Sequence, residues 1–244
     1  METWIFGNHA VRALLETTPE RALSLHYVPE KNEAKRMDLV YQAEGSGIAC
    51  QAVTKAQLDS WLGAVTHQGL ALKIRAQKMR DENDLLTILE NKKKPAFLLI
   101  LDGVQDPHNL GACLRSAEAA GVDAVLIPDH KAVGLTPVVR KVASGATEWL
   151  PLIQVGNLSR VMRELKDLGI WFIGTDGEAK KTLFEIDLRM PLAWVMGSEG
   201  SGLRRLTREL CDFEVSIPLQ GKVESLNVSV ASAICLFETL RQRL

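Results

Sequence analysis

From residue 96 onward, short apolar runs alternate with segments of helical period, and this alternation constrains the fold more than any other feature. Residues 97–101 form a continuous apolar run, which is typical of a strand covered on both faces. Residues 158–168 place their apolar side chains on one face of a helix, and Gly169 ends it. Because strands that alternate with helices pair in parallel, the sequence predicts an α/β fold with a mainly parallel sheet and helices on both faces.

The same periodicities assign elements along the whole chain. Strands are predicted at 23–28, 48–53, 71–74, 97–101, 124–127, 150–155, 170–174, 192–196 and 213–217. Helices are predicted at 9–15, 32–45, 55–62, 110–120, 137–143, 158–168, 203–211 and 226–241.

A change of composition between these elements suggests two domains. Residues 76–95 are rich in charge and close with Lys92, Lys93, Lys94 and Pro95, although four apolar residues within them would fit one short helix. We therefore predict a small amino-terminal α/β domain over 1–75, a linker over 76–95 and a larger domain over 96–244.

Charge and hydropathy exclude several classes of protein. The 244 residues include 29 basic and 30 acidic side chains, so bulk charge does not attract this chain to a polyanion, although this balance does not exclude a local basic patch. No apolar run approaches the roughly 18 residues of a membrane helix, and the first residues do not resemble a signal peptide. The expected protein is cytoplasmic, with no membrane contact.

The four cysteines do not indicate a metal site. Cys50, Cys113, Cys211 and Cys235 are far apart in the sequence, and none forms a Cys-x-x-Cys pair. We expect four buried, reduced thiols and no metal.

Three loops that follow predicted strands carry the polar residues of interest. Ligands of parallel sheets bind beyond the carboxyl ends of the strands. The first loop, 102–111, gathers Asp, Gln, Asp, His and Asn, and continues to Arg115. Asn109 is a candidate N-cap of the next helix, and a cap with a solvated arginine is the simplest interpretation of this loop.

The second and third loops differ in character. Residues 196–202 hold three glycines around Glu199, and glycines let backbone N–H groups approach a ligand closely. The spacing matches neither a dinucleotide fingerprint nor a Walker loop, and Glu199 would suit a polar or cationic group. In residues 225–231, Ser225 or Asn227 could be a simple N-cap of the last helix.

Together and in this order, the loops resemble the three signature motifs of the SpoU (TrmH-type) RNA ribose 2′-O-methyltransferases of the SPOUT class. The matching segments are 109–115, 197–202 and 225–229. Residues 6–14 and 66–69 also resemble the small RNA-binding domain of one branch of that family. That branch includes an enzyme that methylates a guanosine of 23S ribosomal RNA, so the resemblance implies this substrate.

The resemblance implies a cofactor, a topology and an assembly. The cofactor would be S-adenosylmethionine, held by Gly197, Ile217 and Leu226. The catalytic domain would carry a trefoil knot at its carboxyl end. The residue pattern alone does not predict such a knot, and knots are nearly absent from protein folds. A homodimer is also implied.

The resemblance also assigns catalytic residues. In the family the arginine at the position of Arg115 is proposed as the base, although a guanidinium stays protonated up to a pKa above about 12. We therefore expect Arg115 to bind the phosphate and ribose and to stabilise the developing alkoxide. Asn109 would position the ribose or Arg115, and Glu199, Ser225 and Asn227 would orient the loop and the substrate.

Other functions remain as alternatives. A transfer-RNA 2′-O-methyltransferase would keep the chemistry and change the substrate. A non-catalytic RNA-binding or ribosome-assembly factor would keep only the fold, and the intact motif residues count against it. A dinucleotide-binding enzyme lacks its Gly-x-Gly-x-x-Gly after the first strand.

Two further groups of residues can be explained by packing or solvation alone. The tryptophans show no spacing of a base-stacking platform, so core packing is expected for most of them: Trp4, Trp61, Trp149, Trp171 and Trp194. Arg204, Arg205 and Arg208 form a basic face beside the second loop, which is either solvated or a phosphate contact.

Overall fold

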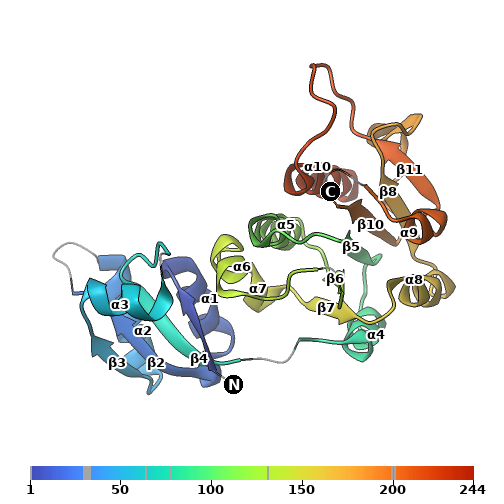
Figure 1. Cartoon of the computed structure of the whole chain (residues 1–244). Coiled ribbons are helices and arrows are strands. Elements are labelled where there is room, and N and C mark those ends of the chain that lie inside the picture. Colours follow the sequence, from blue (N-terminus) through green and yellow to red (C-terminus); the bar gives the residue numbers. More distant parts are fainter. Residues whose placement is uncertain are drawn as a thin grey trace. The chain divides into compact units, whose positions relative to one another are not determined.

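The computed structural model describes residues 2–29, 34–63, 65–76, 79–130, 132–198, 200 and 202–244, and these form two compact units (Figure 1). Unit 1 comprises 1–78 together with 135–149, and unit 2 comprises 79–134 and 150–244. Residues 32–33 of a predicted helix, 77–78 of the predicted linker, Glu199 and Ser201 lie outside the described residues.

The described part of unit 1 has a four-stranded sheet in the order β1-β4-β2-β3. β4 is antiparallel to both of its neighbours, and β2 and β3 are parallel. The strands are β1 (Glu2–Phe6), β2 (Ala22–Tyr27), β3 (Ala49–Ala52) and β4 (Leu70–Arg75). The helices are α1 (Asn8–Thr17), η1 (Pro19–Arg21), α2 (Ala34–Gly45), α3 (Lys55–Leu62), α6 (Pro137–Val142) and α7 (Ala146–Trp149).

Helices cover the two faces of this sheet unequally. Alternate apolar residues of the strands, such as Ile5, Leu25 and Leu72, form one buried cluster with α1 and α2. On the other face a smaller cluster joins Phe6 and Ala71 to α3. The sheet face that carries Phe6 and Ala71 is therefore the less covered of the two.

Helices α6 and α7 pack on α1 and β1, although their sequence lies between two strands of the other sheet. Gly145 has φ +96°, and a Cβ there would lie 2.7 Å from the Cβ of Ala13, so only glycine permits this approach. Glu148 accepts from Arg21 at 2.8 Å and from Arg140 at 2.7 Å. The predicted 96–244 domain differs from unit 2 in this segment, since 135–149 clusters with unit 1.

The described part of unit 2 has a seven-stranded sheet in the order β7-β6-β5-β10-β8-β11-β9, with parallel pairing throughout. This confirms the predicted α/β class with a mainly parallel sheet. Its strands are β5 (Phe97–Asp102), β6 (Ala124–Pro128), β7 (Leu152–Val155), β8 (Trp171–Thr175), β9 (Lys181–Thr182), β10 (Leu192–Gly197) and β11 (Phe213–Ser216). Its helices are α4 (Glu82–Glu90), α5 (Pro107–Ala119), α8 (Leu158–Asp167), η2 (Leu183–Glu185), α9 (Arg205–Glu209) and α10 (Val228–Arg243).

Strands β5 and β10 are almost entirely buried at the centre of this sheet, as the continuous apolar run predicts. Side chains of α4 and α8 share one apolar cluster with alternate residues of the strands. On the opposite face, α10 packs on α5, and Trp194 donates its indole N–H to Thr239 at 2.8 Å. Figure 1 shows these two helix pairs on either side of the sheet.

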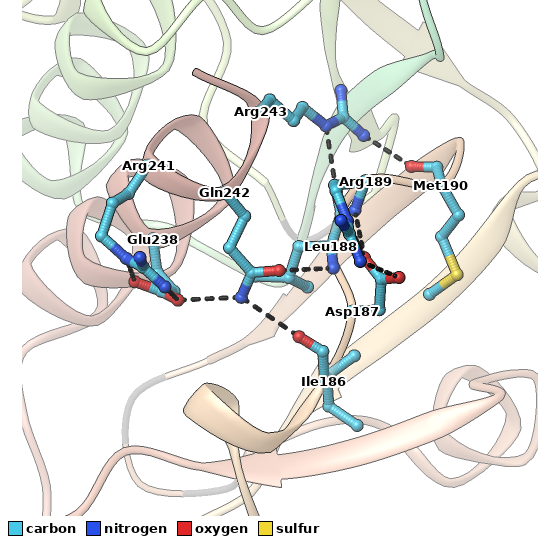
Figure 2. A network of polar contacts seen from close by, with 9 residues as sticks. All are labelled: Ile186, Asp187, Leu188, Arg189, Met190, Glu238, Arg241, Gln242 and Arg243. Carbon is cyan, nitrogen blue, oxygen red and sulfur yellow. Dashed lines mark hydrogen bonds and ion pairs between the residues drawn. The ribbon is translucent and has the colours of Figure 1, made fainter.

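The last turn of α10 is tied to the segment that precedes β10 (Figure 2). The Gln242 side chain accepts from Leu188 N at 2.9 Å and donates to Ile186 O at 3.1 Å. Arg243 donates to the carbonyls of Leu188 and Met190, at 3.0 and 2.6 Å. These bonds give backbone groups of an irregular segment the partners that a strand would otherwise supply.

We expect acid to weaken this attachment. Bidentate hydrogen bonds from Arg241 hold the pKa of the Glu238 carboxyl at about 2, below its ordinary 4.5. A carboxyl group whose pKa is lowered in the folded state stabilises the fold at pH values above its pKa in the unfolded chain. This stabilisation is lost as the pH falls from about 4.5 to about 2. Glu238→Gln should therefore flatten the loss of stability in that window, measured by urea unfolding.

Asp187 supplies the matched control. Hydrogen bonds from Arg189 also lower its pKa to about 2, but this pair is exposed to solvent. Exposed ion pairs contribute little, so Asp187→Asn should leave the acid profile nearly unchanged. Equal flattening by both variants would contradict the assignment to Glu238.

The structure corrects several expectations from the sequence. Asp106, not Asn109, caps α5, accepting from His108 N at 2.8 Å, because Pro107 starts the helix earlier than the periodicity predicts. The expected burial of most tryptophans is also wrong: Trp61, Trp149 and Trp171 are 43%, 55% and 44% exposed.

Other short features depend on their neighbours. Periodicity does not predict strand β1, whose five residues form an edge strand paired with β4. Cys113 and Cys235 are buried, Cys50 and Cys211 are half-buried, and none of the four is in a disulfide bond. Burial raises the pKa of Cys211 and of Cys235 to about 12.

Among the described helices, none is long and apolar enough to cross a membrane.

Candidate active site

A cavity of about 690 Å³ opens at the carboxyl ends of β8, β10 and β11. This is the edge at which a parallel sheet ordinarily binds its ligand. The described lining comprises Thr175, Asp176, Gly177, Glu178, Met196, Gly197, Ser198, Gly200, Gly202, Val215, Ile217, Leu219, Glu224, Ser225, Leu226, Asn227, Val228 and Ala231.

One wall of the cavity is a tight loop at the end of β10. Ser198 and Gly202 exchange two backbone hydrogen bonds, at 3.0 and 3.1 Å, which close the loop on itself. A Cβ on Gly197 would lie 2.1 Å from the carbonyl carbon of Gly202, so no side chain fits there. Gly200 and Gly202 have φ +86° and +65°, in the left-handed region. The glycines of this loop are therefore required by its backbone geometry.

The start of α10 also lines the cavity. Asn227 caps this helix, and its Oδ1 accepts from the N–H of Ser229 at 2.9 Å. Its Nδ2 donates to Oδ1 of Asn109, on α5, at 2.9 Å. Residues 118 positions apart are thus joined through one amide whose two ends have separate partners. This arrangement fixes the orientation of the Asn227 side chain beside the cavity.

These two roles of Asn227 can be separated by mutation. Asn227→Asp keeps a capping oxygen but removes the donor to Asn109, whereas Asn227→Ala removes both. We expect Asn227→Ala to lower the free energy of unfolding by about 1–2 kcal/mol through the lost cap, and Asn227→Asp to lower it less. Urea denaturation measures both, and an equal loss for the two variants would contradict the capping role.

The basic residues beside the cavity are engaged in ion pairs. Arg204 lies 3.2 Å from Oδ1 of Asp102, a buried carboxylate that also accepts from Thr207 at 2.7 Å. Arg208 lies 2.5 Å from Oδ2 of Asp176. Because these carboxylates already hold Arg204 and Arg208, the two guanidinium groups are less suited to a phosphate than the sequence suggests.

The structure brings together most, but not all, of the residues singled out from the sequence. Gly197, Ile217, Ser225, Leu226 and Asn227 line the cavity. Asn109 lies behind Asn227, which it contacts directly. Arg115 is exposed on α5 and is not part of the described lining. Glu199 lies outside the described residues.

The sequence patterns miss three carboxylates of the lining, namely Asp176, Glu178 and Glu224. Their signal in the sequence is weak, since they lie in loops with no recognisable motif. Together with Met196, Ile217 and Leu219 they give the cavity acidic and apolar sides. Such a lining suits an uncharged ring combined with hydroxyl or cationic groups. Among the described residues, no cluster of three His, Cys, Asp or Glu side chains could hold a metal ion.

Comparison with known proteins bears on both units. Residues 96–237 match the family model of the SpoU rRNA methylase family. Residues 4–80 match the model for RNA 2′-O ribose methyltransferase substrate binding. A curated relative, the 23S rRNA (guanosine-2′-O-)-methyltransferase RlmB of Shewanella oneidensis, is 52% identical over 239 residues, which is 98% of this chain and 97% of the relative.

Solved structures show the same fold. An RNA 2′-O ribose methyltransferase superposes with a TM-score of 0.81 at 28% identity, covering 99% of this chain and 89% of the other. The SpoU methyltransferase AviRb from Streptomyces viridochromogenes, solved in complex with AdoMet, has a TM-score of 0.81 at 23% identity, over 99% of this chain and 90% of its own. The second and third motif loops line one cavity, the first is joined to the third through Asn109, and the sequence is matched over both units, so the chain belongs to the SpoU rRNA methylase family.

Proposed function

We propose that the chain transfers a methyl group from S-adenosylmethionine to the ribose 2′-hydroxyl of a guanosine in 23S ribosomal RNA. The observation that carries this proposal is the 52% identity, over nearly the full length of both chains, to a 23S rRNA (guanosine-2′-O-)-methyltransferase. The match of residues 4–80 to a substrate-binding family model supports an RNA substrate. A ribosomal RNA substrate implies a cytoplasmic location.

The cavity fits the proposed cofactor in size and chemistry. Its volume of about 690 Å³ lies within the usual range for small-molecule sites. Gly197, Ile217 and Leu226 would offer backbone groups and apolar surface to the adenosine, and the acidic lining would suit hydroxyl and sulfonium groups. S-adenosylmethionine, when bound, supplies an electrophilic methyl group.

The residues of the chain act on the RNA. Arg115 is exposed on α5, where its guanidinium is accessible to a phosphate and to the oxygen that develops negative charge. Asn109 and Asn227 hold the ends of α5 and α10 together, so they position the helix that carries Arg115. Ser225 would orient the substrate from the cavity wall. We assign Glu199 the same orienting role.

We also propose that the carboxyl end forms a trefoil knot. β10 returns to the centre of the sheet between β5 and β8, and the chain then continues through β11 to α10, which packs back on α5. A crystal structure that traces residues 197–227 continuously would test the knot, and an unthreaded path would exclude it.

A homodimer is the proposed assembly. Val230 and Phe237 are 48% and 47% exposed and lie seven residues apart, on one face of α10. Burying this face against a second copy would remove apolar surface from water near the cavity. Phe237→Lys should yield a monomer in analytical ultracentrifugation, and an unchanged mass would refute this interface.

One experiment tests the reaction, cofactor and substrate together. The purified chain is incubated with methyl-labelled S-adenosylmethionine and RNA from cells that lack its gene, and the label is mapped by mass spectrometry. We expect a single 2′-O-methylguanosine in 23S ribosomal RNA. Label in transfer RNA would retain the chemistry and overturn the substrate. A chain that neither binds the cofactor nor labels RNA would be a non-catalytic RNA-binding factor.

A further inference from the structure

Three aromatic rings from three elements of unit 1 form one cluster, which we call the aromatic platform: Trp4 of β1, His26 of β2 and Trp61 of α3. The two indoles are stacked, with centroids 5.8 Å apart and planes inclined by 13°. The imidazole meets Trp4 and Trp61 edge-on, at 5.3 and 5.2 Å. Edge-on and offset-stacked rings stabilise one another, so the platform is a preformed surface.

The platform is not a core. His26 is buried, but Trp61 is 43% exposed, although a tryptophan that served packing alone would be expected to lie largely inside. The sheet face that carries Trp4 is the less covered one, where α3 packs with a small cluster around Phe6 and Leu58. Gln51, on β3 beside His26, is also exposed. A large aromatic surface therefore faces solvent on a polar sheet face.

The pairing register places cationic groups on the same face. Lys73 of β4 lies directly opposite Trp4 of β1, and paired residues project to the same side of a sheet. Arg75 follows two positions along β4, and its side chain is exposed. Glu2 is an acidic neighbour, whose carboxylate lies 2.5 Å from Lys73. Because Glu2 holds Lys73, Arg75 is the cation that this face presents to an anionic backbone.

The hydrogen bonds and the pKa of His26 are consistent with a ligand at the aromatic platform. Its Nε2 lies 2.9 Å from the hydroxyl of Ser24, whereas its Nδ1 is buried and has no hydrogen-bond partner among the described residues. Burial, and secondarily the charge of Lys73, lowers the pKa of His26, which favours the neutral ring. An unpaired polar atom in a folded domain requires an explanation. Here it lies at the base of the two indoles.

We infer that the aromatic platform stacks an unpaired base of the RNA substrate on Trp61, while Arg75 contacts a neighbouring phosphate. This inference rests on the proposed function, because the domain's match to a substrate-binding model makes RNA the occupant. Indole faces stack on any base, and unpaired bases in loops are the part of a folded RNA that aromatic side chains reach. The platform would thus recognise single-stranded character rather than a particular base.

The test uses the full chain and an unmethylated transcript of 23S ribosomal RNA. We expect Trp61→Ala to weaken binding to a single-stranded segment of that transcript by about tenfold, to raise KM and to leave kcat nearly unchanged. Trp61→Phe, which keeps a ring, should restore most of the affinity. Arg75→Gln should weaken binding moderately and reduce its dependence on salt. Tyr41→Ala is the matched control, since Tyr41 is 64% exposed on α2, which covers the opposite face.

Binding and activity separate the two proposals. Weaker RNA binding by Trp61→Ala supports the platform even where the unaltered chain methylates no RNA, a result that would defeat only the proposed reaction. Unchanged RNA affinity in Trp61→Ala and Arg75→Gln would overturn the platform, whatever happens to the melting temperature. A change of oligomeric state in Trp61→Ala, with RNA affinity unchanged, would also overturn it and identify a second copy of the chain as the occupant.

Discussion

Gly197→Ala should abolish cofactor binding and methyl transfer together. The new methyl group would lie 2.1 Å from the carbonyl carbon of Gly202 and 2.4 Å from the nitrogen of Leu203, both backbone atoms that cannot rotate away. The loop would have to open at the bridge between Ser198 and Gly202, which forms a wall of the cavity. Displacement of about 1 Å at a site of this kind costs roughly 100-fold in rate. Calorimetric titration with S-adenosylmethionine and a methyl-transfer assay measure the two losses.

Gly45→Ala is the control for this substitution. Gly45 ends α2 and does not need a positive φ, and a methyl group at this position would have no atom within 4 Å. The same chemical change should therefore leave the melting temperature and the activity intact. If Gly197→Ala bound the cofactor with wild-type affinity, the cavity wall would not be part of the cofactor site.

Arg115→Ala should separate cofactor binding from turnover. Arg115 lies on α5 outside the described lining of the cavity, so its removal should leave the affinity for S-adenosylmethionine unchanged. Removing one preorganised group that stabilises developing negative charge costs about 100- to 1,000-fold in kcat. Single-turnover methyl transfer at saturating RNA measures this loss directly.

Two further variants make the Arg115 result specific. Arg115→Lys keeps the charge but not the planar pair of donors, so we expect partial activity. Arg163→Ala removes an exposed arginine from α8 and should change nothing. Substantial activity in Arg115→Ala would remove this residue from the catalytic assignment and leave positioning by Asn109 and Asn227.

The helices and strands of unit 2 are predictable because their patterns are local. Strand β5 is recognisable as a continuous apolar run, and α8 by apolar residues at helical spacing. The start of α5 differs from its prediction because Asp106 and Pro107 together form a stronger helix start than Asn109. The three motif loops are expected at one edge because all parallel strands end there.

Contacts between distant residues are not predictable in this way. The bond between Asn109 and Asn227 joins α5 to the start of α10, and nothing in the sequence indicates that these two residues meet. The attachment of Arg243 to carbonyls near β10 likewise depends on how α10 lies across the sheet (Figure 2). The same holds for the stack of Trp4 on Trp61, which the spacing of the tryptophans does not suggest.

The sequence by itself determined the class of fold, most of its elements and the motif residues that line the site. These follow from periodicity, from glycines and from resemblance in three short motifs, all of which act over a few neighbouring residues. Only the tertiary structure decided that 135–149 packs with unit 1, which carboxylates line the cavity, and which tryptophans stay exposed. The physical reason is that these features depend on packing between elements far apart in the chain, and packing is settled by shape and burial rather than by local pattern.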